Sequence, residues 1–352
     1  MAHSSNITVI MVTSAARSNP TTILFERVWN SYVSLVPNFL NWPKFVICDH
    51  PKKVIETEED VKLRTKRGEM CSMYASRYSK YLENLEALIK NESNGRFKNT
   101  NIVKNEKWRG FGGSLWDSLA ERVKTEYVLV LQHDRCIERY VNMEMALRVM
   151  DESLKQSKTI NGFNDDSSAE NNHTQRVTNA VNYIVFLSRN TFFFKNRVPP
   201  KIASQLKLKK FTLSHESVDT LNNYDRIFPQ QDPFPRDEIH LLPLPFVWDS
   251  THIARKSWYI DAFKAGSIGT SFPEDTFGNY ILTQTKQTSL DEVERQWGAY
   301  LWWDVPLTLE DAASNFDATT WILAIRHLDT NRQHNLDKIL GTKKGFYMQN
   351  IV

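Results

Sequence analysis

The chain has 352 residues, of which 41% are hydrophobic and 24% charged, the composition of an ordinary globular protein. Its 44 Lys and Arg nearly balance its 41 Asp and Glu, giving a net charge of +3. A duplex-binding protein carries a larger and more clustered basic excess, so no nucleic acid is expected as a partner. No stretch approaches the ~18 consecutive apolar residues of a membrane span. Three scattered cysteines favour a reducing compartment, so we expect a cytoplasmic protein.

The first 137 residues alternate predicted strands and helices. Short β-branched and apolar runs predict buried strands, and apolar residues at helical spacing predict helices. The strands are expected at 7–12, 44–48, 102–103 and 127–131, and the helices at 21–35, 70–89 and 114–123. Strands that alternate with helices imply βαβ units. We therefore predict an α/β fold with a mostly parallel central sheet and helices on both faces.

The rest of the chain has a less regular pattern. It predicts strands at 183–187 and 239–248 and helices at 250–263 and 273–284, the last with Pro273 in its first turn. Two polar stretches, 161–176 and 198–236, are expected to be variable loops. Because no low-complexity linker divides the chain, we predict a single domain over 1–352, made of one part at 1–137 and a second at 138–352.

Polar residues follow three of the predicted strands in the first half. In a parallel α/β sheet, ligands bind beyond the carboxyl ends of the strands. That rule places 13–17, Asp49 with His50, and 132–134 along one edge of the sheet. These segments are far apart in the sequence, and the fold is expected to bring them together.

The segment Tyr127-Val-Leu-Val-Leu-Gln-His-Asp134 is a buried strand that ends in an acidic residue. A diphosphate bound with Mg²⁺ or Mn²⁺ needs hard oxygen ligands, and an Asp at a strand end supplies one. Alternatively, Asp134 only ends the strand and pairs with Arg135 or Arg139. The segment alone leaves both interpretations open.

Residues 109–134, a glycine turn, a helix, a short loop and then YVLVLQHD, resemble the segment of GT-A glycosyltransferases that leads into their DxD motif. Asp134 matches the final Asp, which coordinates the metal in that family. Gln132 stands where the family usually has the first Asp, and it is a poorer metal ligand. The resemblance implies that Gln132, His133 and Asp134 bind the nucleotide-sugar donor.

A second segment, from Trp248-Asp249 to Phe272-Pro-Glu-Asp-Thr-Phe-Gly-Asn-Tyr280, resembles the acceptor region of the same family. In inverting members an acidic pair opens a helix there, and its Asp is the general base. Asp275 matches that position and Glu274 the residue before it, so the resemblance implies that both are catalytic. An attacking hydroxyl must lose a proton to such a group. Pro-Glu-Asp is also a common helix start, favoured by the helix dipole, and by itself indicates no more than that.

A third segment, Trp321-Ile-Leu-Ala-Ile-Arg-His327, places a histidine after an apolar run. The family often has a histidine after the acidic helix that completes the metal site. The resemblance therefore implies that His327 binds Mn²⁺ or Mg²⁺ beside Asp134, with His334 as the second choice.

Further roles follow from position and from the resemblance. Thr13, Ser14 and Arg17 are expected at the donor, and Asp49 is expected to accept a hydrogen bond from a pyrimidine N–H. Exposed aromatic faces often bind sugars, so Trp302, Trp303, Trp248 and Trp116 are candidates, although core packing is the more usual role of such rings. The expected acceptor-binding residues are Trp248, Asp249, Trp302 and Trp303. Arg255 or Lys256 is a candidate to offset diphosphate charge. The Gly-Phe-Gly-Gly of 110–113 lacks the pattern of a phosphate-binding loop.

Taken together, the resemblance implies a transferase that moves a sugar, preferably from a UDP-sugar, to a hydroxyl of a glycan acceptor with inversion. Residues 1–137 would hold the donor and 138–352 the acceptor. Three alternatives remain open. They are a retaining transferase, a non-catalytic carbohydrate-binding scaffold, and a nucleotidyltransferase, which normally has a glycine-rich loop after its first strand that is absent at 14–20.

Overall fold

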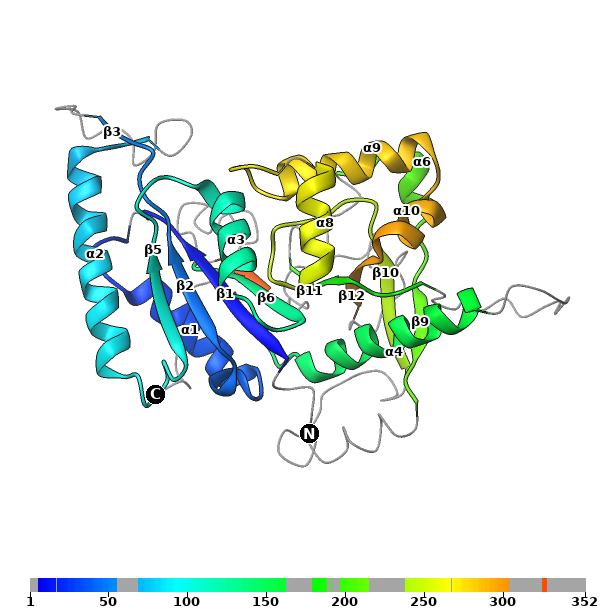
Figure 1. Cartoon of the computed structure of the whole chain (residues 1–352), viewed down its shortest axis with the longest axis horizontal. Helices are drawn as coiled ribbons and strands as arrows, with labels where there is room; N and C mark the ends of the chain where they lie inside the picture. The colour runs from blue at the N-terminus through cyan, green and yellow to red at the C-terminus, as the bar shows by residue number, and fades with distance from the viewer. Residues whose placement is uncertain are drawn as a thin grey trace, which may run out of the picture.

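The computed structural model describes residues 6–16, 18–55, 69–162, 179–188, 191, 197–214, 238–266, 268–303 and 325–327. Its main sheet has nine strands in the order β5-β2-β1-β6-β11-β8-β12-β10-β9. The strands are β1 (Ile7–Thr13), β2 (Lys44–Cys48), β5 (Thr100–Lys104), β6 (Tyr127–Gln132), β8 (Tyr183–Val185), β9 (Lys209–Thr212), β10 (Glu238–Pro243), β11 (His252–Arg255) and β12 (Ala299–Trp303). Strands from both halves of the chain share this one sheet (Figure 1).

The four strands predicted in the first half form the parallel part of the sheet. β1 pairs in parallel with β2 and with β6, and β2 pairs in parallel with β5. Every residue of β1 and of β6 is buried, as their apolar sequences require. The predicted α/β fold with a mostly parallel core is confirmed.

The second half contributes strands that run in both directions. β11 is antiparallel to both β6 and β8, whereas β12 is parallel to β8 and antiparallel to β10. The predicted helix over 250–263 is therefore wrong in its first part, because 252–255 is the buried strand β11. A helix begins only at Lys256. The short apolar run fits either structure, and pairing with β6 decides between them.

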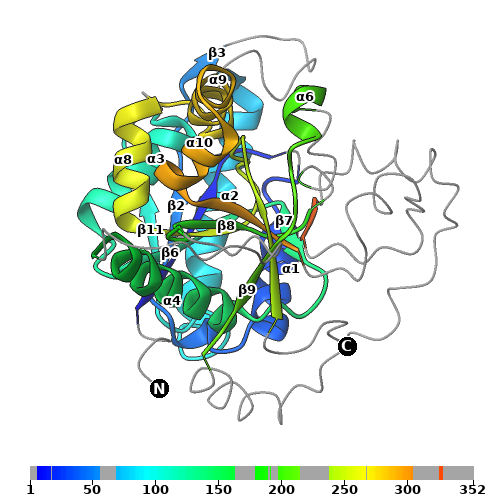
Figure 2. The ribbon, with the colours of Figure 1, turned by 90° about the vertical axis from the view of Figure 1, so that its right-hand side faces the viewer.

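Helices cover both faces of the sheet. They include α1 (Ile23–Leu35), α2 (Ser72–Asn91), α3 (Gly110–Glu121), α4 (Met143–Gly162), α6 (Pro200–Ala203), α8 (Lys256–Gly266), α9 (Asn279–Gln287) and α10 (Leu290–Trp297). Short turns of other helix types lie at η1 (Phe39–Asn41) and η3 (Glu274–Gly278). Figure 2 shows α3 and α8 on one side of the sheet and α1 on the other. Helices on both sides explain why every residue of β1 and of β6 is buried.

Two small sheets accompany the main one. β13 (Ile325–His327) pairs antiparallel with β7 (Arg135–Ile137), which follows β6 after a two-residue turn. β3 (Lys53–Ile55) pairs in parallel with β4 (Glu69–Cys71). Among the described residues, no helix is long and apolar enough to cross a bilayer.

Candidate functional site

The expected alignment of polar residues at the carboxyl ends of the parallel strands is confirmed by the strand register. Thr13 pairs with Cys48, and Val12 pairs with Gln132, so β1, β2 and β6 end at the same edge. The backbone N–H of Asp49 donates to the carbonyl of Thr13 at 3.0 Å. Ser14 follows directly and is half-buried, whereas Arg17 lies outside the described residues. The edge where ligands bind in such sheets is therefore lined by the predicted residues.

Gln132 joins this edge to the second half of the chain. Its Nε2 donates to the carbonyl of Asp249 at 2.7 Å, and its Oε1 accepts from the Nε of Arg135 at 2.8 Å. One side chain therefore acts as donor and acceptor at once, which an amide does and a carboxylate does not. This is a physical reason for glutamine at the position where the DxD motif has its first Asp.

The segment that carries Asp249 is held by hydrogen bonds to its neighbouring carbonyls. The hydroxyl of Tyr183 donates to the carbonyl of Trp248 at 2.5 Å, and the N–H of Phe186 donates to that of Thr251 at 3.1 Å. The carbonyl of Ser250 accepts from Nδ1 of the buried His252, so Nε2 of this ring accepts from the hydroxyl of Tyr259. Burial lowers the pKa of His252 to about 4, which keeps the ring neutral.

The Asp249 carboxyl group meets that of Glu274 at the start of η3. The two side chains share a hydrogen bond, and the Glu274 carboxyl also accepts from the backbone N–H of Asp249. Burial, and then the contact with Asp249, raise the pKa of Glu274 to about 8. Arg197 opposes this rise, with a guanidinium nitrogen 3.4 Å from a Glu274 oxygen. Burial and the contact between the two carboxyl groups therefore favour the neutral form of Glu274.

Asp275 differs from Glu274 although it is the next residue. It is exposed, and its backbone N–H donates to the carbonyl of Phe272 at 3.0 Å in the turn that opens η3. An exposed carboxylate beside a neutral one is open to a substrate hydroxyl. The two catalytic candidates are thus side by side in one turn, with different surroundings.

The third predicted segment reaches the same edge through β13. His327 pairs in register with Arg135, the residue directly after the half-buried Asp134 (Figure 2 shows β13 beside β7). Asp134 lies in the turn directly before β7, so the backbone places it next in the chain to the residue that His327 opposes. Within the described ranges, no group of three or more His, Cys, Asp or Glu side chains forms a metal site. Two protein ligands together with diphosphate oxygens suit Mg²⁺ or Mn²⁺, so the placement fits a metal that arrives with its nucleotide.

Asp49 has more partners than a residue reserved for a nucleotide would need. Its Oδ1 accepts from the backbone N–H of Arg109 at 2.9 Å and from Nδ2 of Asn105 at 3.2 Å. Its Oδ2 accepts from the backbone N–H of Gly110 at 3.0 Å. The carboxylate therefore caps α3, where the helix dipole favours a negative charge. No local pattern indicates this contact, because Asp49 and Arg109 are 60 residues apart.

The aromatic residues expected to bind the acceptor are in the core. Trp248, Trp302 and Trp303 are exposed by only 1%, 7% and 2%. Rings so deeply buried present no face to a sugar, so the expectation based on exposed aromatic faces is wrong for all three, and their apolar area stabilises the sheet instead.

Arg255 and Lys256 are also misplaced for the role expected of one of them. Arg255 pairs with Tyr127, at the start of β6 and thus at the opposite edge of the sheet from Gln132. It forms an ion pair with Glu126, and Lys256 donates to the carbonyl of Val123 at 2.8 Å. Neither offsets charge at the carboxyl edge. Among the described residues, Arg197 forms an ion pair with Glu274. No local sequence pattern indicates this contact.

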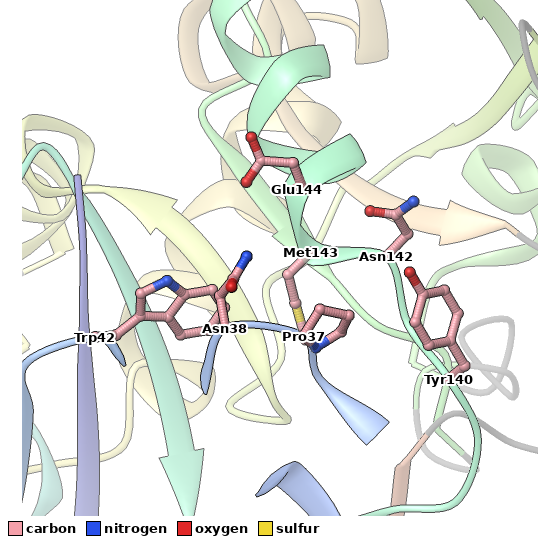
Figure 3. Close-up of a pocket in the computed structure, with 7 residues that line it drawn as sticks. All are labelled: Pro37, Asn38, Trp42, Tyr140, Asn142, Met143 and Glu144. Atoms are coloured by element: carbon pink, nitrogen blue, oxygen red, sulfur yellow. The ribbon is translucent and has the colours of Figure 1, made fainter. Parts of the chain in front are cut away.

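A small cavity lies away from this edge, between the end of α1 and the start of α4 (Figure 3). Its volume is about 10 Å³, the space of a single water molecule. It is lined by Pro37, Asn38, Trp42, Tyr140, Asn142, Met143 and Glu144. None of the predicted site residues lines it, and a nucleotide or sugar needs a far larger space.

No model of a known protein family matches the chain, and no curated protein sequence is detectably similar to it. Among solved structures it is similar to S. aureus TarS 1–349, with 12% identity, 79% of this chain and 55% of that chain covered, and a TM-score of 0.37. It is also similar to the mannosyltransferase PcManGT from Pyrobaculum calidifontis in complex with GDP-Man and Mn²⁺. The identity is 11%, 89% of this chain and 59% of that chain are covered, and the TM-score is 0.34. For CMP:2-keto-3-deoxy-manno-octonic acid synthetase complexed with CTP, the identity is 10%, 96% of this chain and 98% of that chain are covered, and the TM-score is 0.34.

In other matches a smaller share of the known structure is covered. The chain spans only 20% of S. aureus TarS, 32% of TarS 1–349 in its UDP-GlcNAc complex and 19% of GalNAc-T7 with UDP, GalNAc and Mn²⁺. Nucleotide-sugar complexes thus recur among the similar structures, but the low TM-scores carry no argument about function. The fold class rests on the strand order and register described above.

Proposed function

We propose that the protein is a glycosyltransferase that moves a sugar from a nucleotide-diphosphate donor to a hydroxyl group of a glycan or similar acceptor. The observation that supports this most is the meeting of two separately predicted segments. Gln132 at the end of β6 is hydrogen-bonded to Asp249, and Asp249 is hydrogen-bonded to Glu274 at the start of η3. The donor-binding and acceptor-binding motifs of the resemblance therefore share one edge of the sheet.

In this proposal the reaction is one displacement with inversion at the anomeric carbon. The acceptor oxygen forms a bond to that carbon as the bond from carbon to the diphosphate oxygen breaks. Asp275 takes the proton of the acceptor hydroxyl, which its exposure permits. The raised pKa of Glu274 favours its neutral form, which reduces the negative charge beside the Asp275 carboxylate.

The diphosphate leaving group carries the electron pair of the broken bond. A divalent cation, when bound, would stabilise that charge, and Asp134 with His327 would hold it. UDP is the nucleotide we favour. Thr13, Ser14 and Arg17 would contact the donor, as would His133, which is half-buried at the same edge.

The experiment that tests the proposal is a thermal-shift screen of the purified chain against UDP, GDP, dTDP, CDP, ADP and CTP, each with and without Mn²⁺. A ligand that binds only the folded state raises the melting temperature by mass action, so no acceptor is needed. We expect a manganese-dependent rise with one nucleoside diphosphate, UDP first. A rise with CTP alone would favour a nucleotidyltransferase, and no rise with any nucleotide would favour a non-catalytic scaffold.

A further inference from the structure

The loop that carries the acidic pair rests directly on the first turn of α3. Gly110 has a φ of +64°, and a Cβ built there would lie 2.1 Å from the carbonyl oxygen of Thr270. A Cβ on Gly112 would lie 2.3 Å from that of Ser271 and 2.8 Å from that of Gly269. Carbon and oxygen atoms do not approach so closely, so only glycine permits this backbone contact. The glycines that fail as a phosphate-binding loop therefore have another use.

Side chains reinforce the same contact. Phe111, between the two glycines, stacks on Phe272 with ring centroids 5.0 Å apart. The chain then passes through Pro273 into Glu274, so the loop has little freedom between α3 and the acidic pair. The other end of η3 is equally close-fitting, since a Cβ on Gly278 would lie 2.8 Å from the carbonyl oxygen of Val247, two residues before Asp249.

Asp49 holds the first turn of α3 in place. Its carboxylate accepts from the backbone N–H groups of Arg109 and Gly110, the latter being one of the two glycines under the loop. Asp49 is only 7% exposed, so these bonds are shielded from competing water. A continuous series of contacts therefore runs from Asp49 through α3 and the loop to Glu274.

We infer that Asp49 is a positioning residue for Glu274. Through the glycine-rich first turn of α3, Asp49 holds the Glu274 carboxyl group against that of Asp249. This deepens the proposed function, on which it rests for the meaning of the site, and it gives Asp49 a role other than binding a pyrimidine. Substitutions at Asp49 or Gly112 shift the loop, and Glu274 then leaves its buried contact.

The test measures the titration of Glu274 directly, by ¹³C NMR of protein labelled at its glutamate side-chain carboxyl carbons. Glu274→Gln identifies the resonance. The described groups that face Glu274 are Asp249, Arg197 and Tyr183, and none of them is altered in the test variants. We expect the pKa of Glu274, about 8 in the wild type, to fall by about one unit or more in Asp49→Asn and in Gly112→Ala as the group becomes solvated.

Two matched control variants are available, one on α3 and one in the turn after α2. Asp117→Asn removes a carboxylate of α3 that pairs with the Arg109 side chain, at 2.6 Å, rather than with the backbone. Gly95→Ala adds a methyl group whose nearest neighbour is 3.6 Å away. Both are expected to leave the pKa of Glu274 unchanged.

An unchanged pKa of Glu274 in folded Asp49→Asn would overturn the inference. If that variant also lost its nucleotide-induced thermal shift, Asp49 would be a nucleotide ligand only and the proposed function would stand. If instead the wild type bound no nucleotide but Asp49→Asn lowered the pKa, the proposed function would fail and the positioning role would hold. Gly112→Ala gives an independent reading through a residue that makes no ligand contact in either scheme.

Discussion

The carboxyl groups of Asp249 and Glu274 share a hydrogen bond although 25 positions separate them in the sequence, and burial together with this contact raises the pKa of Glu274 to about 8. Two ionised carboxyl groups in hydrogen-bond contact would repel each other in a half-buried site, so a proton between them favours the contact. The pair joins the segment before β11 to the turn that opens η3. Its state of protonation is therefore linked to the stability of the fold.

The first prediction concerns that linkage. The pKa of Glu274 is raised in the folded state, so the stabilisation it gives is fully present below about pH 4.5, declines as pH rises, and is lost above about pH 8. In Glu274→Gln this group no longer titrates, so the free energy of unfolding should fall less between pH 5 and pH 8 than in the wild type. Urea unfolding at a series of pH values measures the difference, and parallel curves would contradict the assignment.

The second prediction separates the two acidic neighbours. Asp275→Asn removes the proposed base, and we expect transfer to fall by about 10²–10⁴-fold because general base catalysis contributes that much. The nucleotide-induced thermal shift should be unchanged, since Asp275 touches no donor group in the proposal. Activity near that of the wild type would exclude Asp275 as the base and leave Glu274 as the candidate.

The third prediction addresses the metal. Asp134→Ala should abolish the manganese-dependent part of the thermal shift with the preferred nucleotide, because it removes the carboxylate that would bind the cation. Asp291→Ala, at an exposed position in the first turn of α10, is the control and should leave the shift intact. If Asp134→Ala retained the full shift, the metal site would have to be sought elsewhere.

The fourth prediction follows from the amide of Gln132. Gln132→Glu keeps the size of the side chain but replaces the donor to the Asp249 carbonyl with an acceptor, which leaves a partly buried carbonyl without this partner. We expect a loss of about 1–3 kcal/mol in the free energy of unfolding. Gln287→Glu, at the exposed end of α9, should change it by less than about 0.5 kcal/mol. Equal effects of the two substitutions would show that the hydrogen bond to Asp249 contributes nothing.

The fifth prediction concerns the ion pair between Glu294 of α10 and Lys209 of β9. Glu294 is 3% exposed and accepts from Lys209 at 2.7 and 2.8 Å and from the hydroxyl of Tyr300 at 2.7 Å. Glu294→Ala leaves a largely buried ammonium group unpaired, so it should destabilise the protein by about 3–5 kcal/mol. The control is Glu292→Ala, whose exposed pair with Arg295 is worth about 1 kcal/mol or less. Chemical denaturation compares the two.

The parallel strands were predictable because their signal is local. Val128, Leu129 and Val130 lie in a continuous apolar run, and such a run predicts a strand buried on both faces wherever it pairs. The shared carboxyl edge then follows from the rule that neighbouring parallel strands end together. The position of that edge, with Asp134 shortly after β6, could therefore be predicted from the sequence alone.

What the sequence did not predict depends on partners distant along the chain. The stretch 250–263 was predicted to be helical throughout, but the pairing of β11 with β6 makes a strand of 252–255, in which His252 and Arg255 are buried. The burial of Trp302 and Trp303 could not be predicted locally, because it depends on the strands that pair with β12 on either side. Similarly, nothing near Glu274 in the sequence shows that Asp249 faces it.

The direction of β11 has a consequence for how this protein tolerates change. The strand runs from the carboxyl edge, where Asp249 lies, to the opposite edge, where Arg255 pairs with Tyr127. Side chains alternate along a strand, so removing or adding one residue between these positions would turn every side chain of β11 to the other face. Substitutions can be absorbed one at a time, but the number of residues from 249 to 255 is fixed by the need to reach both edges. Among relatives of this chain, insertions should therefore be absent from this stretch even where its residues differ.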